Sequence, residues 1–273
     1  MNVLKMEKKI QILNALVEGN SIRSTERMTG CHRDTILKLL VEVGDKCQKV
    51  SDSHIKDFHS RLIQVDEIWT FVGKKEKKLT ESEKDSNLFG DQYCFVAMDA
   101  ESKLIPNYEV GKRNLETTLK FISNLKDKLK NNGRIQLTSD GFKPYLDAIE
   151  LFFGGDIDFA QLIKVYSPDK AGRGRYSPPK VSGVLSKILS GKPNERNIST
   201  SYVERQNLTI RMQMRRFTRL TNAFSKKIEN LKAALALHFT HYNFMRVHSS
   251  LQVTPCMAAG ITDSIWNWED LLK

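Results

Sequence analysis

The order of predicted strands and helices between residues 62 and 166 constrains the fold most. Three strand-like runs follow one another at 62–72, 92–99 and 104–110. Helical and strand-like patterns then alternate, with a helix at 115–129, a strand at 135–138, a helix at 144–153 and a strand at 161–166. Consecutive strands followed by such alternation predict an α/β fold, in which helices cover the faces of a mixed sheet.

The N-terminal segment has a different pattern, made of short amphipathic helices. The helical runs lie at 7–18, 21–28 and 32–43. Residues 29–31 (Thr-Gly-Cys) join the last two of these helices. Two helices joined by a short glycine turn are typical of helix-turn-helix DNA-binding modules, although an ordinary three-helix packing module has the same pattern. In the DNA-binding interpretation, the third helix presents Arg33 and Lys38 to DNA.

These patterns divide the chain into four parts. We expect a helix-turn-helix module at 1–50, a connector at 51–61, a large domain at 62–250 and a C-terminal tail at 251–273. Within the large domain, residues 167–200 are basic and rich in Gly and Pro, which predicts a flexible insertion. Such a segment either becomes ordered on a polyanion or is a linker without a role. A long helical stretch then runs from 200 to 245, with a break near 220–222.

The charge of the chain is unevenly distributed. The net charge is +11, and residues 161–250 hold 17 Lys and Arg against 4 Asp and Glu, a net charge of +13. An excess of this kind indicates an acidic partner, most simply nucleic acid. Arg211, Arg215 and Arg219 recur every four residues, so they are predicted to line one helix face. The predicted DNA contacts in this region are Arg205, Asn207, Arg211, Arg215, Arg216 and Arg219. A solvated basic helix is the alternative.

The cysteines and the apolar runs argue against several other classes of protein. Cys31, Cys47, Cys94 and Cys256 have neither metal-ligand nor redox-motif spacing, so we predict no zinc site. No apolar run is long enough to span a bilayer, and no signal peptide is recognisable. The sequence therefore predicts reduced thiols, a cytoplasmic location and no membrane partner.

Three acidic residues stand at structured positions. Asp66 lies inside the first strand, and alternation predicts that it points to a solvent face while Glu67 points to the opposite face. Asp140 directly follows a strand, and Glu204 lies in the first turn of a helix, where the helix dipole favours its charge. Each residue alone is also explained as a turn or capping residue. Together the three carboxylates could hold Mg²⁺.

The segments around these acids resemble the catalytic blocks of bacterial insertion-sequence transposases of the insertion sequence one type. The blocks are VDEIW at 65–69, TSDGFKPY at 138–145 and YVERQNLTIR at 202–211. The tail YNFMRVHSSL at 242–251, followed by Thr254-Pro255, also resembles the end of such proteins. The resemblance implies an RNase H-like catalytic core with an Asp-Asp-Glu triad, whose members by position are Asp66, Asp140 and Glu204.

The resemblance also implies a chemistry. Such an enzyme uses two Mg²⁺ ions about 4 Å apart, or Mn²⁺ in their place, to nick the ends of a DNA element and to transfer the 3′-OH to target DNA. Its partner is double-stranded DNA, and it acts as a homo-oligomer because two ends must be held together. Asn207 either orients Glu204 or contacts DNA. A helix-turn-helix regulator with a non-catalytic core, and an RNase H-like nuclease without strand transfer, are the alternatives.

Overall fold

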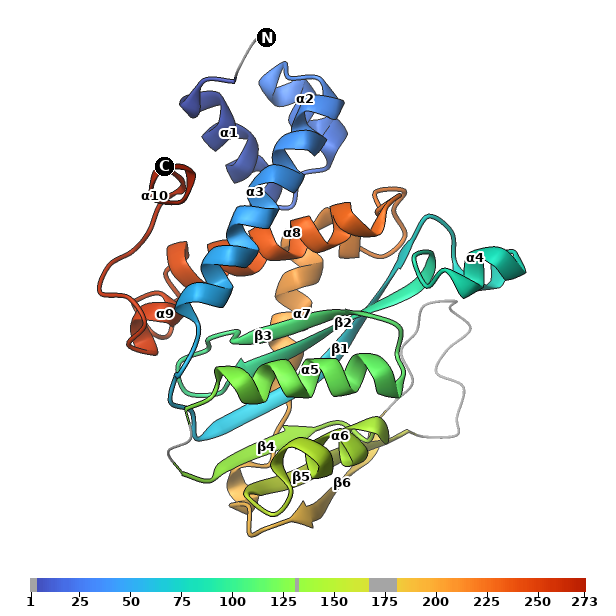
Figure 1. Cartoon of the computed structure of the whole chain (residues 1–273), viewed down its shortest axis with the longest axis vertical. Helices are drawn as coiled ribbons and strands as arrows, with labels where there is room; N and C mark the ends of the chain where they lie inside the picture. The colour runs from blue at the N-terminus through green and yellow to red at the C-terminus, as the bar shows by residue number, and fades with distance from the viewer. Residues whose placement is uncertain (1–3, 131–132, 167–180) are drawn as a thin grey trace.

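The computed structural model describes residues 4–130, 133–166 and 181–273, and it has a mixed α/β fold (Figure 1). One six-stranded sheet has the order β3-β2-β1-β4-β5-β6. Its strands are β1 (Leu62–Val72), β2 (Gly90–Asp99), β3 (Asn107–Gly111), β4 (Ile135–Ser139), β5 (Ile157–Tyr166) and β6 (Val181–Ser190). The first three strands are antiparallel, β4 and β5 run parallel to β1, and β6 is antiparallel to β5.

The central strand β1 has two different edges. It pairs with β2 from Ile63 to Val72, but it pairs with β4 only from Leu62 to Gln64. Beyond Gln64 the edge of β1 that faces β4 is therefore free of strand partners. Asp66 and Glu67 lie on this free stretch, directly after the point where the two parallel strands separate.

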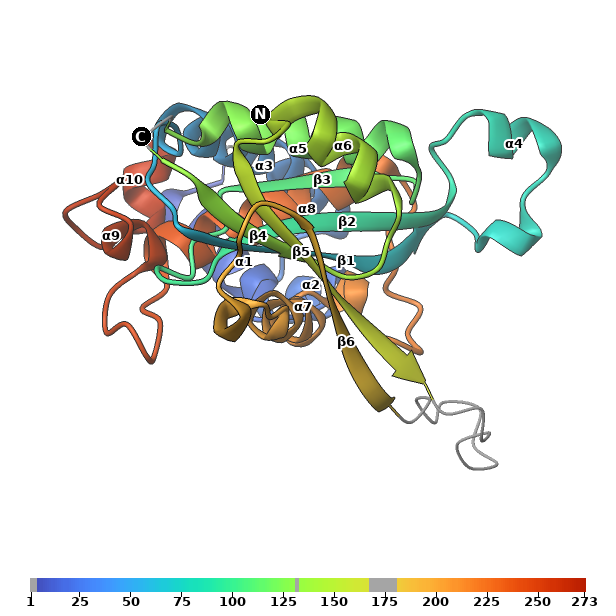
Figure 2. The same ribbon diagram turned by 90° about the horizontal axis from the view of Figure 1, so that it is seen from below.

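Helices cover both faces of the sheet. Figure 2 shows α5 (Leu115–Lys128) and α6 (Pro144–Phe153) on one side and α7 (Ser201–Gln213) on the other. Val65 belongs to the core under α5 and α6, whereas Ile68 belongs to the core under α7 and α8 (Ile228–Thr240). Because both faces are covered, the prediction that Asp66 faces solvent is wrong. Asp66 lies on the face that α7 covers.

The N-terminal helices pack onto the sheet domain through α8. They are α1 (Met6–Val17), α2 (Ile22–Thr29) and α3 (Arg33–His54), and they share a core with α8 and with Trp268 of α10 (Trp268–Leu272). A Cβ added at Gly44 of α3 would lie 2.6 Å from the Ala233 Cβ, so the α3 and α8 backbones cross closely. α3 continues to His54 because this contact buries its second half, and the predicted connector at 51–61 therefore begins inside a helix.

Part of the predicted flexible insertion at 167–200 is regular structure. Residues 167–180 lie outside the described residues, but Val181–Ser190 form β6 and Glu195–Asn197 form a 3₁₀ turn. The pairing of β6 with β5 is non-local, and the segment contains Gly183 and several serines, so its local sequence carries a weak strand signal. The prediction of a flexible segment is wrong for residues 181–190.

The predicted long helix at 200–245 is three separate segments. α7 ends at Gln213, a 3₁₀ turn spans Arg215–Phe217, and α8 begins only at Ile228 and passes into a π-helical turn at His241–Met245. Met214 and Phe217 are both buried in the core under α7, and the chain turns at extended Met214 to bury both. The prediction that Arg211, Arg215 and Arg219 line one helix face is therefore wrong.

The remaining helices are short. They are the 3₁₀ turn Glu76–Lys78, α4 (Glu81–Asp85) and α9 (Pro255–Ala258). The first two lie in the charged segment between β1 and β2, whose side chains are mostly exposed. Among the described residues, no helix is long and apolar enough to cross a membrane.

Candidate functional site

A cleft of about 1040 Å³ opens where β1 and β4 separate. Its lining brings together four carboxylates, from Asp66, Glu67, Asp140 and Glu204. The same lining contains the cationic side chains of Arg113, Lys143, Lys164, Arg211 and Arg219. The acids predicted from sequence therefore lie in one cleft with basic residues around them.

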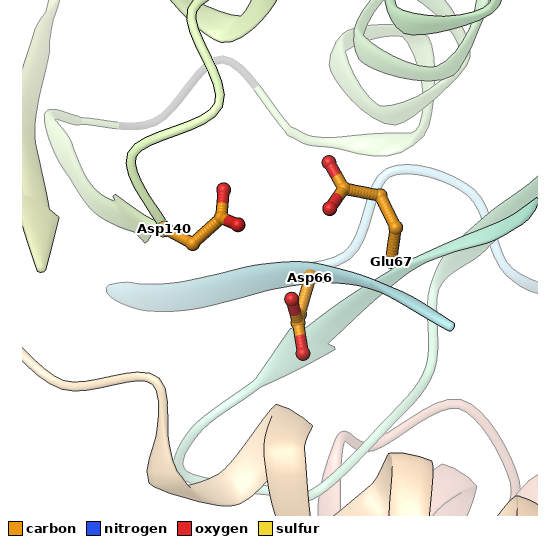
Figure 3. A group of neighbouring side chains, drawn as sticks. All are labelled: Asp66, Glu67 and Asp140. Carbon is orange, nitrogen blue, oxygen red and sulfur yellow. The ribbon is translucent and has the colours of Figure 1, made fainter. Parts of the chain in front are cut away.

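Three of the four carboxylates form a close group. One oxygen each from Asp66, Glu67 and Asp140 lies within 4.8 Å of the others. Figure 3 shows Asp66 and Glu67 on opposite sides of β1, with Asp140 at the end of β4 beside them. The Asp140 Oδ1 accepts a hydrogen bond of 2.9 Å from the backbone N–H of Phe142, which fixes the turn after β4. Because this turn leaves the sheet, Asp140 approaches both faces of β1.

Asp66 is held in a partly desolvated position. The Asn207 Nδ2 donates a hydrogen bond of 2.8 Å to the Asp66 Oδ2, so α7 orients this carboxylate. Burial and the nearby charge of Asp140 raise the pKa of Asp66 to about 6. Burial disfavours the charged form of an acid, and a neighbouring carboxylate adds repulsion. Asn207, which the sequence predicted as a partner of Glu204 or of DNA, is therefore a partner of Asp66.

Glu67 is the acidic residue that sequence reasoning set aside. Its side chain is 3% exposed, and its Oε1 makes no hydrogen bond of good geometry in the described residues, although the Tyr145 hydroxyl interacts with this carboxylate and lowers its pKa. Burial and the charge of Asp140 raise the pKa of Glu67 to about 8, against the favourable charge of Arg113. The Arg113 Nη2 lies 3.6 Å from Glu67 and 3.5 Å from Asp140. A second acid directly beside Asp66 in an apolar strand is the sequence signal that could have identified it.

Glu204 lies in the same cleft but has a different partner. It is in the first turn of α7, as predicted. The Lys164 Nζ lies 2.6 Å from both of its carboxylate oxygens, and the Thr200 Oγ1 donates to Oε1 at 2.6 Å. Burial lowers the pKa of Lys164, but the hydrogen bond and the charge of Glu204 together with smaller contributions exceed it, so the pKa of Lys164 is raised. Glu204 is thus neutralised by a lysine and stands apart from the close group.

The start of α7 is fixed to the sheet. The Gln64 Oε1 accepts hydrogen bonds from the backbone N–H groups of Tyr202 and Val203, at 2.9 and 3.2 Å. Gln64 is the last residue of β1 that pairs with β4. The residue that ends this pairing therefore also positions the helix turn that carries Glu204.

The predicted DNA contacts are dispersed. Arg211 and Arg219 line the cleft, and Arg205 is exposed on α7. Arg216 is half-buried, and its Nη1 donates to the Ser225 Oγ at 2.9 Å. The two candidates in the N-terminal helices, Arg33 and Lys38, are exposed. Arg33 lines a second groove of about 570 Å³ together with Arg215.

The close group fits a divalent cation. Its donors are carboxylate oxygens, which Mg²⁺ and Mn²⁺ accept as ligands. The buried Glu67 Oε1, which makes no hydrogen bond of good geometry in the described residues, is an acceptor that a cation would satisfy. Burial, followed by the charge of Asp140, raises the pKa values of Asp66 and Glu67, and a bound cation would favour their ionised forms. Asp66, Glu67 and Asp140 are therefore the residues that could hold a metal.

Known proteins with similarity to this chain were found among solved structures. No protein-family model and no curated protein matches the sequence. Solved structures with partial similarity include the Mos1 transposase paired-end complex with left transposon end, at 16% identity and a TM-score of 0.24. That match covers 58% of this chain and 60% of the other. A Mos1 strand transfer complex matches at 15% identity, with the same TM-score of 0.24 and the same coverage of 58% and 60%.

Proposed function

We propose that this chain is a metal-dependent DNA transposase with an RNase H-like catalytic core. One observation carries the proposal, namely the convergence of Asp66 and Asp140 in a cleft that Glu204 also lines. The strand order supports the RNase H-like assignment, because three antiparallel strands continue into two parallel strands at the point where the acids meet. The three catalytic residues of this proposal are Asp66, Asp140 and Glu204.

Asp66 and Asp140 would hold Mg²⁺, with Mn²⁺ as the alternative, and Glu204 would complete the set. When bound, such ions activate the attacking oxygen and stabilise the leaving oxygen of a phosphodiester. The chain itself contributes orientation, because Asn207 fixes the Asp66 carboxylate and Gln64 fixes the turn that carries Glu204. Lys164 holds the Glu204 carboxylate in the cleft, and a metal or DNA would compete with this contact.

DNA is the proposed partner. Arg211 and Arg219 lie in the lining of the cleft, where they can neutralise phosphates, and Arg205, Arg215 and Arg216 lie nearby in sequence. The N-terminal helices would act as a helix-turn-helix module that reads the element ends through Arg33 and Lys38. The reaction nicks the element ends and joins the 3′-OH to target DNA, so two copies of the chain would hold two ends together.

A strand-transfer assay tests this function. The substrate is a DNA fragment that carries the sequences flanking the coding region, incubated with a target plasmid and MgCl₂. Cleavage with joining is expected from the unmodified chain, and neither is expected from Asp66→Asn or Glu204→Gln. Asp147→Asn, at an exposed carboxylate of α6, is the control that keeps activity. Cleavage without joining identifies a nuclease, and binding alone identifies a regulator.

A further inference from the structure

Beyond Glu67, β1 carries two aromatic side chains toward the edge of the cleft. Trp69 and Phe71 point to the same face of the strand as Glu67, because strand side chains alternate. Their ring centroids are 5.8 Å apart, and Phe71 lies 4.4 Å from Phe224, with interplanar angles of 35° and 34°. All three residues are half-buried. The rings therefore form a row that remains open to solvent on one side.

A groove of about 670 Å³ runs along this row, and we call it the aromatic groove. Its lining contains the three rings, no acidic residue and five cationic residues, which are Lys74, Lys75, Lys78, Arg216 and Arg219. The Lys75 Nζ lies 5.9 Å from the Phe71 ring centroid, and the Lys226 Nζ lies 3.6 Å from that of Phe224.

Several of these cations are available to a ligand. Lys74 pairs with Glu83 at 2.6 Å, and Arg216 is bound to Ser225. Lys75, Lys78 and Arg219 make no salt bridge within residues 4–130, 133–166 and 181–273. The groove thus combines cationic side chains that make no salt bridge in the described residues with aromatic rings that are partly accessible.

The aromatic groove and the carboxylate cleft are adjacent. Arg219 lines both of them. Trp69 follows Glu67 by two residues on the same strand face, so the row of rings begins where the carboxylates end.

This combination selects a particular ligand. Exposed aromatic rings bind nucleobases by stacking, and lysines along a groove bind the phosphates between them. Stacking requires unpaired bases, because the bases of a duplex already stack on one another. We propose that the aromatic groove binds an unpaired segment of a DNA strand next to the carboxylate cleft. The identity of the polymer as DNA rests on the proposed function, whereas the recognition of unpaired bases rests on the groove itself.

The test measures binding without catalysis. A fluorescein-labelled thymidine 12-mer and an abasic 12-mer with the same phosphates are titrated with the full chain in EDTA, and anisotropy is recorded. The unmodified chain is expected to bind the thymidine strand about tenfold more tightly than the abasic strand. Phe71→Ala combined with Phe224→Ala is expected to remove this difference, with little effect on the abasic strand. Equal binding of both strands by the unmodified chain would overturn the proposal.

Two further measurements test the groove even if the phenylalanine double variant does not fold. They use lysine variants and cross-linking to the unmodified chain. Lys75→Gln combined with Lys226→Gln is expected to weaken both strands alike and to flatten the salt dependence. Lys126→Gln is the matched control, since the Lys126 Nζ also lies over a phenylalanine ring, 4.7 Å from that of Phe153 on the α5–α6 side. A 5-iodouracil strand is expected to cross-link to Trp69, Phe71 or Phe224, and cross-links confined to other residues would refute the groove.

The same measurements separate the two proposals. Base-dependent binding by the unmodified chain, together with no cleavage of DNA by that same chain in MgCl₂, would support the groove and count against the transposase. Cleavage and joining by the unmodified chain, together with equal binding of both strands in EDTA, would support the transposase and refute the groove.

Discussion

The two sides of the carboxylate cleft have opposite electrostatic states. On one side, which we call the floor, Asp66, Glu67 and Asp140 are held close together by β1 and the end of β4. On the other side, the wall, Glu204 comes from α7 and is paired with Lys164 at 2.6 Å. Burial raises the pKa values of Asp66 and Glu67 on the floor, where Arg113 is the nearby cation at 3.6 Å from Glu67, whereas the single acid of the wall is paired directly with Lys164.

The difference follows from how each side is built. Strand pairing fixes the floor, so its acids cannot separate to relieve their repulsion, and a cation is the simplest compensation. The wall belongs to the first turn of a helix, whose orientation depends on contacts with Gln64 and Thr200. The floor therefore offers carboxylate oxygens that a divalent cation could bind without rearrangement. In the proposed function, Glu204 must first leave Lys164 before it can join them.

The largest expected effect concerns cleavage. Asp140→Asn removes a floor carboxylate, and Mg²⁺-dependent cleavage of DNA is expected to fall by about 10³-fold or more, as for other losses of transition-state charge stabilisation. The cleavage rate of Glu204→Gln is expected to fall by a similar factor, because in the proposed function Glu204 completes the catalytic set. Single-turnover rates with Asp147→Asn as control measure both. Full activity in Asp140→Asn would disprove the proposed active site.

The second prediction separates the two sides by metal binding in the absence of DNA. Mg²⁺ at about a hundred times its dissociation constant stabilises a folded protein by about 2.7 kcal/mol, which is about 5–10 °C for a chain of this size. This rise in melting temperature is expected to disappear in Asp66→Asn and to persist in Glu204→Gln. Differential scanning fluorimetry with EDTA as reference measures it. Equal losses in the two variants would mean that floor and wall are equally preformed.

Sequence reasoning predicts the frame of this site better than its details. The apolar, β-branched run of β1 predicts that strand to the residue, and the end of β4 places Asp140 near Asp66. Strict alternation correctly predicts that Glu67 points to the opposite face of β1 from Asp66. For that reason the sequence gives no cause to place Glu67 in the same site. The sequence does not show that the turn after β4 brings Asp140 within reach of both faces. Only the three-dimensional path of residues 140–142 reveals this.

The sequence does not predict β6 or the end of α7, because both depend on partners outside their own local sequence. β6 forms because β5 provides a pairing edge, although its own residues are largely exposed. The end of α7 at Gln213 depends on burying both Met214 and Phe217 in a core made by other elements. The arginine spacing of four residues therefore describes the sequence but not a helix face. Local periodicity carries no information about either event.

The third prediction tests the charge of the floor through pH. The folded-state pKa values of Asp66 and Glu67, about 6 and about 8, lie above the ordinary values of 3.8 and 4.5. The folded state therefore binds protons more tightly than the unfolded state, and these groups make stability fall as pH rises from about 4 to 8. In EDTA the melting temperature of the unmodified chain should fall over this range.

A double variant isolates this contribution. In Asp66→Asn combined with Glu67→Gln, the melting temperature should fall less as pH rises, because the two titrating carboxylates are absent. At pH 8 this variant should be more stable than the unmodified chain by about 2 kcal/mol. Adding Mg²⁺ to the unmodified chain should reduce the fall, since the cation replaces the protons. Parallel pH profiles for the two chains in EDTA would show that the floor is not strained by its charges.

The smallest expected effect concerns the contact that joins the two sides. Asn207 comes from the same helix as Glu204, but its side chain donates a hydrogen bond of 2.8 Å to Asp66. A residue of the wall therefore orients a carboxylate of the floor. Asn207→Ala is expected to weaken Mn²⁺ binding about tenfold, because removing a group that orients a ligand typically costs this much. Electron paramagnetic resonance of free Mn²⁺ measures the affinity, with the exposed Asn222→Ala as control. If Asn207→Ala binds Mn²⁺ like the unmodified chain, strand pairing alone orients Asp66, and the floor is independent of α7.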